Sequence, residues 1–105
     1  MRFVALNIPQ SEHRNPQRTA RLARHLEARL LDFGPGGPEV LLCDQEKGIV
    51  TARFPGHDTA AVTEQLASRF GVLTETENGC ALFHLTDQTP FEDLDYVWGC
   101  LFDLL

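Results

Sequence analysis

An Asn-Gly step at positions 78 and 79 constrains the fold of this sequence more than any other feature. It joins two runs of β-favouring residues, "VLTETE" and "CALFHLT". Asn-Gly between such runs is a strong signal for a β-hairpin with a two-residue turn, because both residues tolerate a positive φ. A second hairpin is predicted from "EVLLCD" and "GIVTARFP", with "QEKG" in its turn. Two hairpins predict a sheet that is at least partly antiparallel.

Three helices are predicted around the hairpins. The first has Asn15 as its N-cap and Pro16 at its first helical position, and it ends at Gly34. The second runs from a cap at Asp58 to Gly71. The third follows "TPFE" at 89–92, which has the form of a capping box with Pro at the first helical position.

The predicted order of elements is β-α-β-β-α-β-β-α, with a first strand at 2–8 and a Gly-Pro-rich connection at 34–38. This order predicts an α+β fold, a two-layer sandwich in which three helices pack on a mixed or antiparallel sheet. A length of 105 residues and an ordinary hydrophobic content of 43% predict one domain over residues 1–105.

The three cysteines indicate the compartment in which the protein works. They are spaced 37 and 20 residues apart, and an odd number at such spacings does not make a disulfide framework. We therefore expect reduced thiols in a cytoplasmic protein. The apolar stretch at 3–8 is too short for an export signal or a membrane span, so no membrane partner is expected.

The net charge of −6 is unevenly distributed. Residues 1–33 carry six arginines against three acids, a balance of +3, and residues 34–105 carry three basic residues against twelve acids, a balance of −9. We interpret the basic stripe on the first helix as a solvated face, or alternatively as a contact for an acidic partner such as the acidic half of another copy. No nucleic-acid partner is expected, because the domain is acidic and no aromatic residues alternate with the arginines. The stripe consists of Arg14, Arg18, Arg21, His25 and Arg29.

Cys80 and His84 form the most suggestive pair of reactive side chains. On a strand they would share a face, but their Cα atoms would lie about 13 Å apart at about 3.3 Å per residue, too far to share a metal or a proton. We interpret Cys80 as a packed thiol and keep a reactive thiol as the alternative. The cysteines and histidines lack the spacing of a zinc site, so no metal is predicted. Glu75 and Glu77 are interpreted as a solvated strand edge.

The last helix is apolar over most of its surface. A helix of this kind is buried from more than one side. We therefore expect a homodimer or another protein partner to cover the part that does not face the core. The candidate interface residues are Tyr96, Trp98, Phe102, Leu104 and Leu105.

A long run of this sequence, "GIVTARFPGHDTAAVTEQLASRFGVLTETENG", resembles the C-terminal small domain of class V aminotransferases and cysteine desulfurases, which depend on pyridoxal phosphate. In that domain a "gIVSFn.pG.d" strand precedes a helix ending in "L..ryGI", and a strand then leads to "G..C". The final helix of the family follows an "NTeeEID" motif, and "QTPFEDLD" at 88–95 is similar to it. The resemblance covers nearly the whole chain and implies the α+β fold described above.

Three departures from the family bear on activity. The large domain that holds the cofactor and its Schiff-base lysine in the family has no counterpart in this sequence, and the one lysine, Lys47, is predicted in an exposed turn. The family also has a cysteine loop and then a strand with an arginine that anchors the substrate carboxylate. The eight residues between Cys80 and Thr89 leave room for one of these only. In the alignment without a gap, Leu82 stands where the family has the arginine.

The sequence thus favours a non-catalytic relative of this small domain that acts in protein assembly or binding. It would bind no cofactor itself and would meet pyridoxal phosphate only by complementing a separate large domain. Two alternatives remain open. One is a thiol-based sulfur acceptor that uses Cys80, and the other is a regulatory module with a small ligand between the sheet and the helices.

Overall fold

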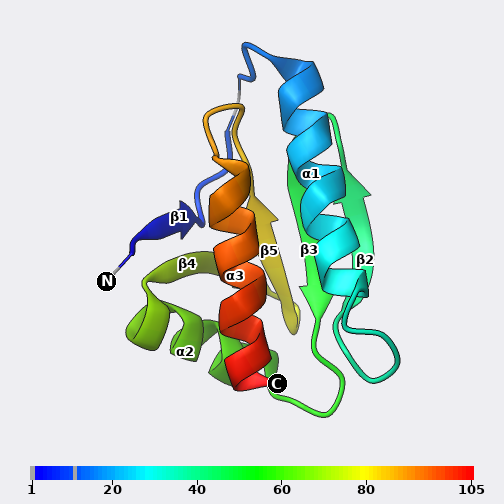
Figure 1. Ribbon diagram of the computed structural model, residues 1–105, viewed down its shortest axis with the longest axis vertical. Coiled ribbons are helices and arrows are strands. Elements are labelled where there is room, and N and C mark those ends of the chain that lie inside the picture. Colours follow the sequence, from blue (N-terminus) through cyan, green and yellow to red (C-terminus); the bar gives the residue numbers. More distant parts are fainter. Residues whose placement is uncertain (1, 11) are drawn as a thin grey trace.

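The computed structural model describes residues 2–10 and 12–105, so Met1 and Ser11 of the predicted domain lie outside the described residues. It contains the eight elements in the predicted order (Figure 1). They are β1 (Val4–Leu6), α1 (Pro16–Leu31), β2 (Glu39–Asp44), β3 (Ile49–Arg53), α2 (Thr59–Phe70), β4 (Val72–Glu77), β5 (Cys80–His84) and α3 (Phe91–Leu104).

The strands form one mixed sheet in the order β1-β4-β5-β3-β2. Both predicted hairpins are confirmed, since β2 pairs antiparallel with β3 and β4 pairs antiparallel with β5. Between the hairpins β3 and β5 pair antiparallel, and β1 adds to β4 as the one parallel pair. The first strand is shorter than predicted, because β1 pairs with β4 only at Val4, Ala5 and Leu6.

The two hairpin turns depend on residues with positive φ. Asn78 and Gly79 have φ of 52° and 77°, as a two-residue turn of type I′ requires. Gly48 closes the other turn at φ 70°, where its N–H donates to the Asp44 carbonyl at 2.8 Å. A Cβ at Gly48 would lie 2.7 Å from the Leu85 carbonyl oxygen, so this position also excludes any side chain by contact.

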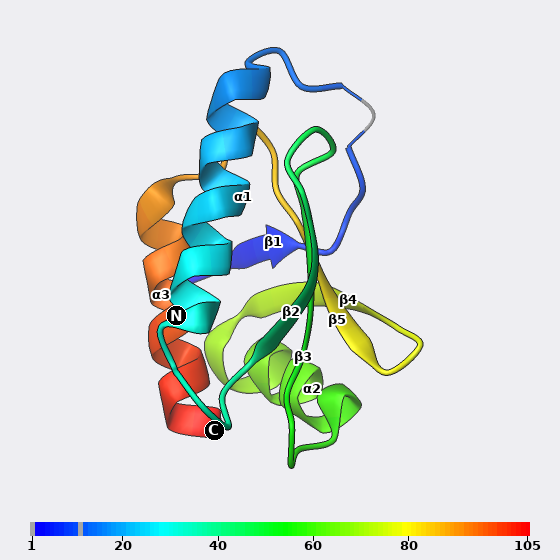
Figure 2. The ribbon, with the colours of Figure 1, turned by 90° about the vertical axis from the view of Figure 1, so that its right-hand side faces the viewer.

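All three helices pack on one face of the sheet. Figure 2 shows α1 and α3 together on one side of β2 and β3. On that side Val50, Ala52, Ala81 and Phe83 of the two central strands are fully buried, whereas Val40 and Cys43 of β2 are half-buried. Along the two central strands, Val50 and Ala52 of β3 lie beside Phe83 and Ala81 of β5 and form the centre of this core. The alternating residues of the same strands point to the opposite face, which no helix covers.

The helix caps follow the sequence prediction for α1 and α2 and depart from it for α3. Asn15 accepts a hydrogen bond from the Arg18 N–H, and Asp58 accepts one from the Ala60 N–H. Gly71 ends α2 in the left-handed conformation. Helix α1 ends at Leu31, slightly before the predicted end at Gly34.

The predicted capping box at 89–92 is wrong. Helix α3 starts at Phe91 with Pro90 as its N-cap and has no side-chain cap. The hydroxyl of Thr89 instead accepts a hydrogen bond from the Thr86 N–H at 3.0 Å. This turn holds the Thr89 side chain against the connection from β5, where it cannot reach the first N–H groups of the helix.

Candidate functional site

The structure places Cys80 and His84 on the same face of β5 but gives them separate partners. The Cys80 thiol points toward the carbonyl oxygen of Asn78, at 3.8 Å, at the exposed hairpin end of the strand. His84 lies at the other end, where its side chain is only 4% exposed. The pair therefore does not form a reactive dyad.

His84 is bonded to an acid from the neighbouring strand. Its Nε2 lies 3.0 Å from Oε1 of Glu75, whose side chain is 39% exposed. Glu75 therefore belongs to a polar pair, and the interpretation of Glu75 and Glu77 as a solvated edge holds only for Glu77, which is exposed. Glu75 to Glu77 extend beyond β1, which pairs with β4 only up to Thr74.

Neither a metal site nor a lysine site is visible in the part of the chain that the structure describes. It contains no cluster of three or more histidine, cysteine or acidic side chains able to hold an ion. Lys47 lies exposed in the turn between β2 and β3, where its backbone N–H donates to Asp44. A lysine that forms a Schiff base is normally desolvated or placed beside another cation, whereas the side chain of Lys47 is exposed to water.

The basic stripe on α1 is largely an internal contact, so the interpretation as a solvated face is wrong for three of its five residues. Arg18 donates to the Asp87 and Thr89 carbonyls at 2.8 and 3.2 Å. His25 and Arg29 both reach Asp95 of α3, at 2.8 and 2.9 Å. Arg14 and Arg21 are exposed, as predicted.

The shared carboxylate of Asp95 is stabilised in its charged form. The hydrogen bond from His25 lowers the pKa of Asp95 most, and burial opposes this by raising it. The hydrogen bond and charge of Arg29 lower the same pKa further. The stripe thus joins α1 to α3, because Asp95 engages His25 and Arg29 within the chain.

The predicted interface residues of the last helix lie in different environments. Tyr96, Leu104 and Leu105 are partly buried against the core, and the Tyr96 hydroxyl donates to the Phe70 carbonyl at 2.8 Å. Trp98 is half-buried beneath Arg29, whose guanidinium lies 4.6 Å from its ring centroid. Phe102 is 55% exposed and stacks on Phe33. Much of the apolar surface of α3 is therefore covered within the chain, by α1 and α2.

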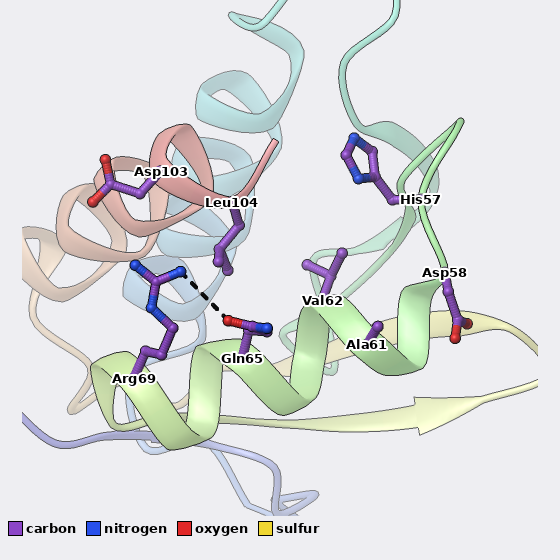
Figure 3. A pocket seen from close by; sticks show the side chains of 8 residues that line it. All are labelled: His57, Asp58, Ala61, Val62, Gln65, Arg69, Asp103 and Leu104. Atoms are coloured by element: carbon purple, nitrogen blue, oxygen red, sulfur yellow. Dashed lines mark hydrogen bonds between the residues drawn. The ribbon is translucent and has the colours of Figure 1, made fainter.

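A shallow cavity of about 260 Å³ lies between α2 and the end of α3 (Figure 3). Arg69 and Asp103 line one side of it, and His57 and Asp58 line the other. Arg69 is engaged within its own helix, where it donates to Gln65 at 3.4 Å and lies over the Phe70 ring. This cavity lies between helices, whereas the predicted small-ligand site lies between the helices and the sheet.

The sheet face away from the helices has no helix over it in the described chain. We call it the open face and define it by the outward side chains near the β4–β5 turn. Its apolar members are half-buried or exposed, with Leu42 at 52% exposure. Figure 2 shows the segment between β1 and α1 passing on the same side of the sheet, toward its other end. The open face consists of Leu42, Thr51, Arg53, Glu75, Glu77, Cys80 and Leu82.

Strand pairing arranges these side chains in two rows across the sheet. One row runs Glu75, Leu82, Thr51 and Leu42 from β4 to β2. The next row, toward the turn, runs Glu77, Cys80 and Arg53, with Cys80 and Arg53 one position beyond the last β3–β5 pair. Arg53 also bonds Glu39 at the sheet edge, at 2.7 Å.

Sequence reasoning identifies only part of this surface. It singles out Leu82 through the family resemblance and Cys80 through its chemistry, but it does not find Leu42, Thr51 or Arg53. The signal that could have found Thr51 and Arg53 is the alternation in "IVTAR". Because the hydrophobic set of alternating side chains faces the helices, the other set must lie on the opposite face of the sheet. For Leu42 the signal is hidden, because the register shift between Val40 and Leu42 breaks the alternation of β2.

No helix in the described chain is long and apolar enough to span a membrane.

The comparisons with known proteins give a match among solved structures. No protein-family model and no curated protein matches this sequence.

Among solved structures, a NifS-like protein matches with a TM-score of 0.69 over 86% of this chain, at 15% sequence identity. The chain spans 28% of the length of that structure. At this level of identity the match establishes the fold. The chain therefore has the fold of one segment of a NifS-like protein, which agrees with the resemblance drawn from its motifs.

Proposed function

We propose that these residues form a protein-assembly domain that performs no catalysis by itself and binds its partner through the open face. The observation that supports this most is the row Glu75, Leu82, Thr51 and Leu42, which no helix covers and which has two leucines and a charged residue at its β4 end. Exposed apolar surface with a polar rim is typical of protein interaction sites. A two-layer domain of this size gains stability when such a face is covered.

The arrangement of reactive side chains supports the absence of catalysis. A catalytic thiol needs a base or cation that acts on it, and the polar contact of the Cys80 thiol is the Asn78 carbonyl oxygen at 3.8 Å. The cation in its row, Arg53, is paired with Glu39 at 2.7 Å. His84 is held by Glu75. The position that the resemblance assigns to a substrate-binding arginine is occupied by Leu82, which faces outward and offers no charge to a carboxylate.

The assembly role is tested by two leucines of nearly equal exposure, one on the open face of the sheet and one at the end of helix α1. Leu42 on the open face is 52% exposed, and Leu31 on α1 is 54% exposed. We expect Leu42→Ser to reduce the apparent size of the native complex in extracts of the cells that produce the protein. Leu31→Ser should leave it unchanged. Equal behaviour of the two variants would contradict the proposal.

The absence of cofactor chemistry is tested with pyridoxal phosphate and the purified protein. We expect no Schiff-base absorbance that depends on Lys47, with Lys47→Arg as the matched control. We also expect Cys80→Ser to leave assembly unchanged. A specific absorbance band that Lys47→Arg removes would favour an active site within this chain.

A further inference from the structure

We infer that the open face binds the open face of a second copy of this chain, across a two-fold axis that runs along β5. The inference rests on the proposed function and names its partner. Two sheets that pack face to face lie about 10 Å apart with their strands within about 30° of each other. An axis close to the β5 direction satisfies this geometry and places β4 of one copy over β3 of the other.

The charges of the open face favour this axis. Of the acids on this side of the sheet, Glu75 lies against His84, and Glu39 pairs with Arg53 at 2.7 Å. Glu77 is exposed, and no ion pair to it occurs among the described residues. Across the row, Glu77 and Arg53 lie on either side of Cys80, at equal distances from the β5 axis. The rotation therefore places Glu77 of each copy opposite Arg53 of the other. The guanidinium of Arg53 bonds Glu39 through Nε and one terminal nitrogen, so its other terminal nitrogen can bind a second carboxylate, and the rotation gives two equivalent ion pairs.

The apolar residues agree with the same axis. Leu82 lies on β5 between Glu75 and Thr51, so the rotation places the two copies of Leu82 against each other at the centre of the contact. The two copies of Cys80 meet in the same way one row further along. An isologous contact needs this self-complementarity, because each residue on the axis faces its own copy.

A two-fold axis perpendicular to the strands is unfavourable. A two-fold axis that crosses the strands at Leu82 would keep β4 over β4 and would place Glu75 of one copy against Glu75 of the other. Like charges in direct opposition across an interface weaken binding. The rows of the sheet therefore select one orientation of the second copy.

The test is a pair of charge reversals studied alone and mixed, by sedimentation across a concentration series. We expect the unaltered chain to dimerise, and we expect Glu77→Arg and Arg53→Glu each to weaken dimerisation about tenfold or more, since two ion pairs become two repulsions.

An equal mixture of the two variants should restore a heterodimer. In the mixed pair, the arginine introduced in one chain faces the glutamate introduced in the other, and the native Arg53 of the first chain faces the native Glu77 of the second. Both contacts are therefore attractive again. The mixture is the decisive sample, since loss of folding in one variant could not produce the recovery.

A second measurement tests the position of the two-fold axis directly. In a chain with Cys43→Ala and Cys100→Ala, a bis-maleimide of about 10 Å span, the spacing of facing sheets, should join the two copies of Cys80. Adding Glu77→Arg should abolish the crosslink. Sedimentation as a monomer at every concentration would overturn the inference, as would a dimer that neither reversal weakens. If Leu42→Ser nevertheless reduces the size of the native complex, the assembly role stands with a different partner.

Discussion

Gly48 and Gly79 are both turn glycines with positive φ, but their surroundings differ. A Cβ at Gly48 would lie 2.7 Å from both the Leu85 carbonyl oxygen and Cγ2 of Thr19, whereas nothing lies within 4 Å of a Cβ at Gly79. We expect Gly79→Ala to lower the free energy of unfolding by about 1–2 kcal/mol, the cost of the left-handed conformation. Gly48→Ala should cost about 2 kcal/mol more, because the contact with backbone cannot relax easily. Urea unfolding of the two variants measures the difference, and equal losses would contradict the packing described for the β2–β3 turn.

Asp95 gives a pH-dependent contribution to stability. Its pKa is lowered in the folded chain by His25 and Arg29, so the stabilisation is fully present above the unfolded pKa of about 3.9 and is lost as the pH falls through the lower, folded value. The Asp95 side chain is 42% exposed, so we expect Asp95→Asn to cost only about 0.5–1 kcal/mol at neutral pH.

The sign of this effect can be checked by comparing the unfolding of the two proteins at several pH values. The difference between the unaltered chain and Asp95→Asn should shrink from about pH 5 toward about pH 2. Glu92→Gln is a matched control at the start of the same helix. A difference that grows as the pH falls from about pH 5 to about pH 2 would show that Asp95 is not stabilised by its partners.

At the scale of elements, the turn at Thr86–Thr89 and the start of α3 are the least predictable part of the fold. The motif at 89–92 matches a capping box in sequence, yet the Thr89 hydroxyl bonds the Thr86 N–H. We expect Thr89→Val to cost about 1–3 kcal/mol, because it leaves this N–H without a partner in a nearly buried turn.

Glu92→Ala distinguishes a capping box at 89–92 from a helix start without a side-chain cap. In a capping box Glu92 would bond the backbone of Thr89, and its loss would be about as costly as that of the threonine. In the structure Glu92 is exposed in the first turn of α3, so we expect a cost of less than about 1 kcal/mol from the helix dipole alone. Urea unfolding decides between them, and equal costs for the two variants would favour the capping box.

The elements that the sequence predicts well depend on local chemistry. The turn at Asn78-Gly79 and the caps at Asn15 and Asp58 use residues within three positions of each other, so a short window of sequence contains the whole signal. The basic stripe on α1 is misinterpreted from sequence because its partner lies far away. His25 and Asp95 are 70 positions apart, and no local pattern connects them.

At the scale of the whole molecule, the sequence predicts the layers but not which surface remains open. The alternation along β3 and β5 assigns one set of side chains to the core and leaves the other set unassigned. Only the strand order shows that Leu82 lies beside Thr51 and Glu75. The row has no helix over it because α1 and α3 lie on the other side (Figure 2), where α2 is joined to the sheet by the Thr63–Thr76 hydrogen bond. The apolar last helix predicts a partner surface on α3, much of which is covered by α1 and α2.

The reactivity of Cys80 tests most directly whether a protein partner covers the open face, because Cys80 lies on that face. It is measured in a chain whose other cysteines are replaced by Cys43→Ala and Cys100→Ala. We predict that a maleimide labels Cys80 slowly in the cells that produce the protein and rapidly after purification and dilution. Leu82→Lys, which places a charge in the centre of the face, should make labelling rapid in both. Equal labelling rates in cells and in dilute solution, with or without Leu82→Lys, would contradict the claim that this face is covered by a protein partner.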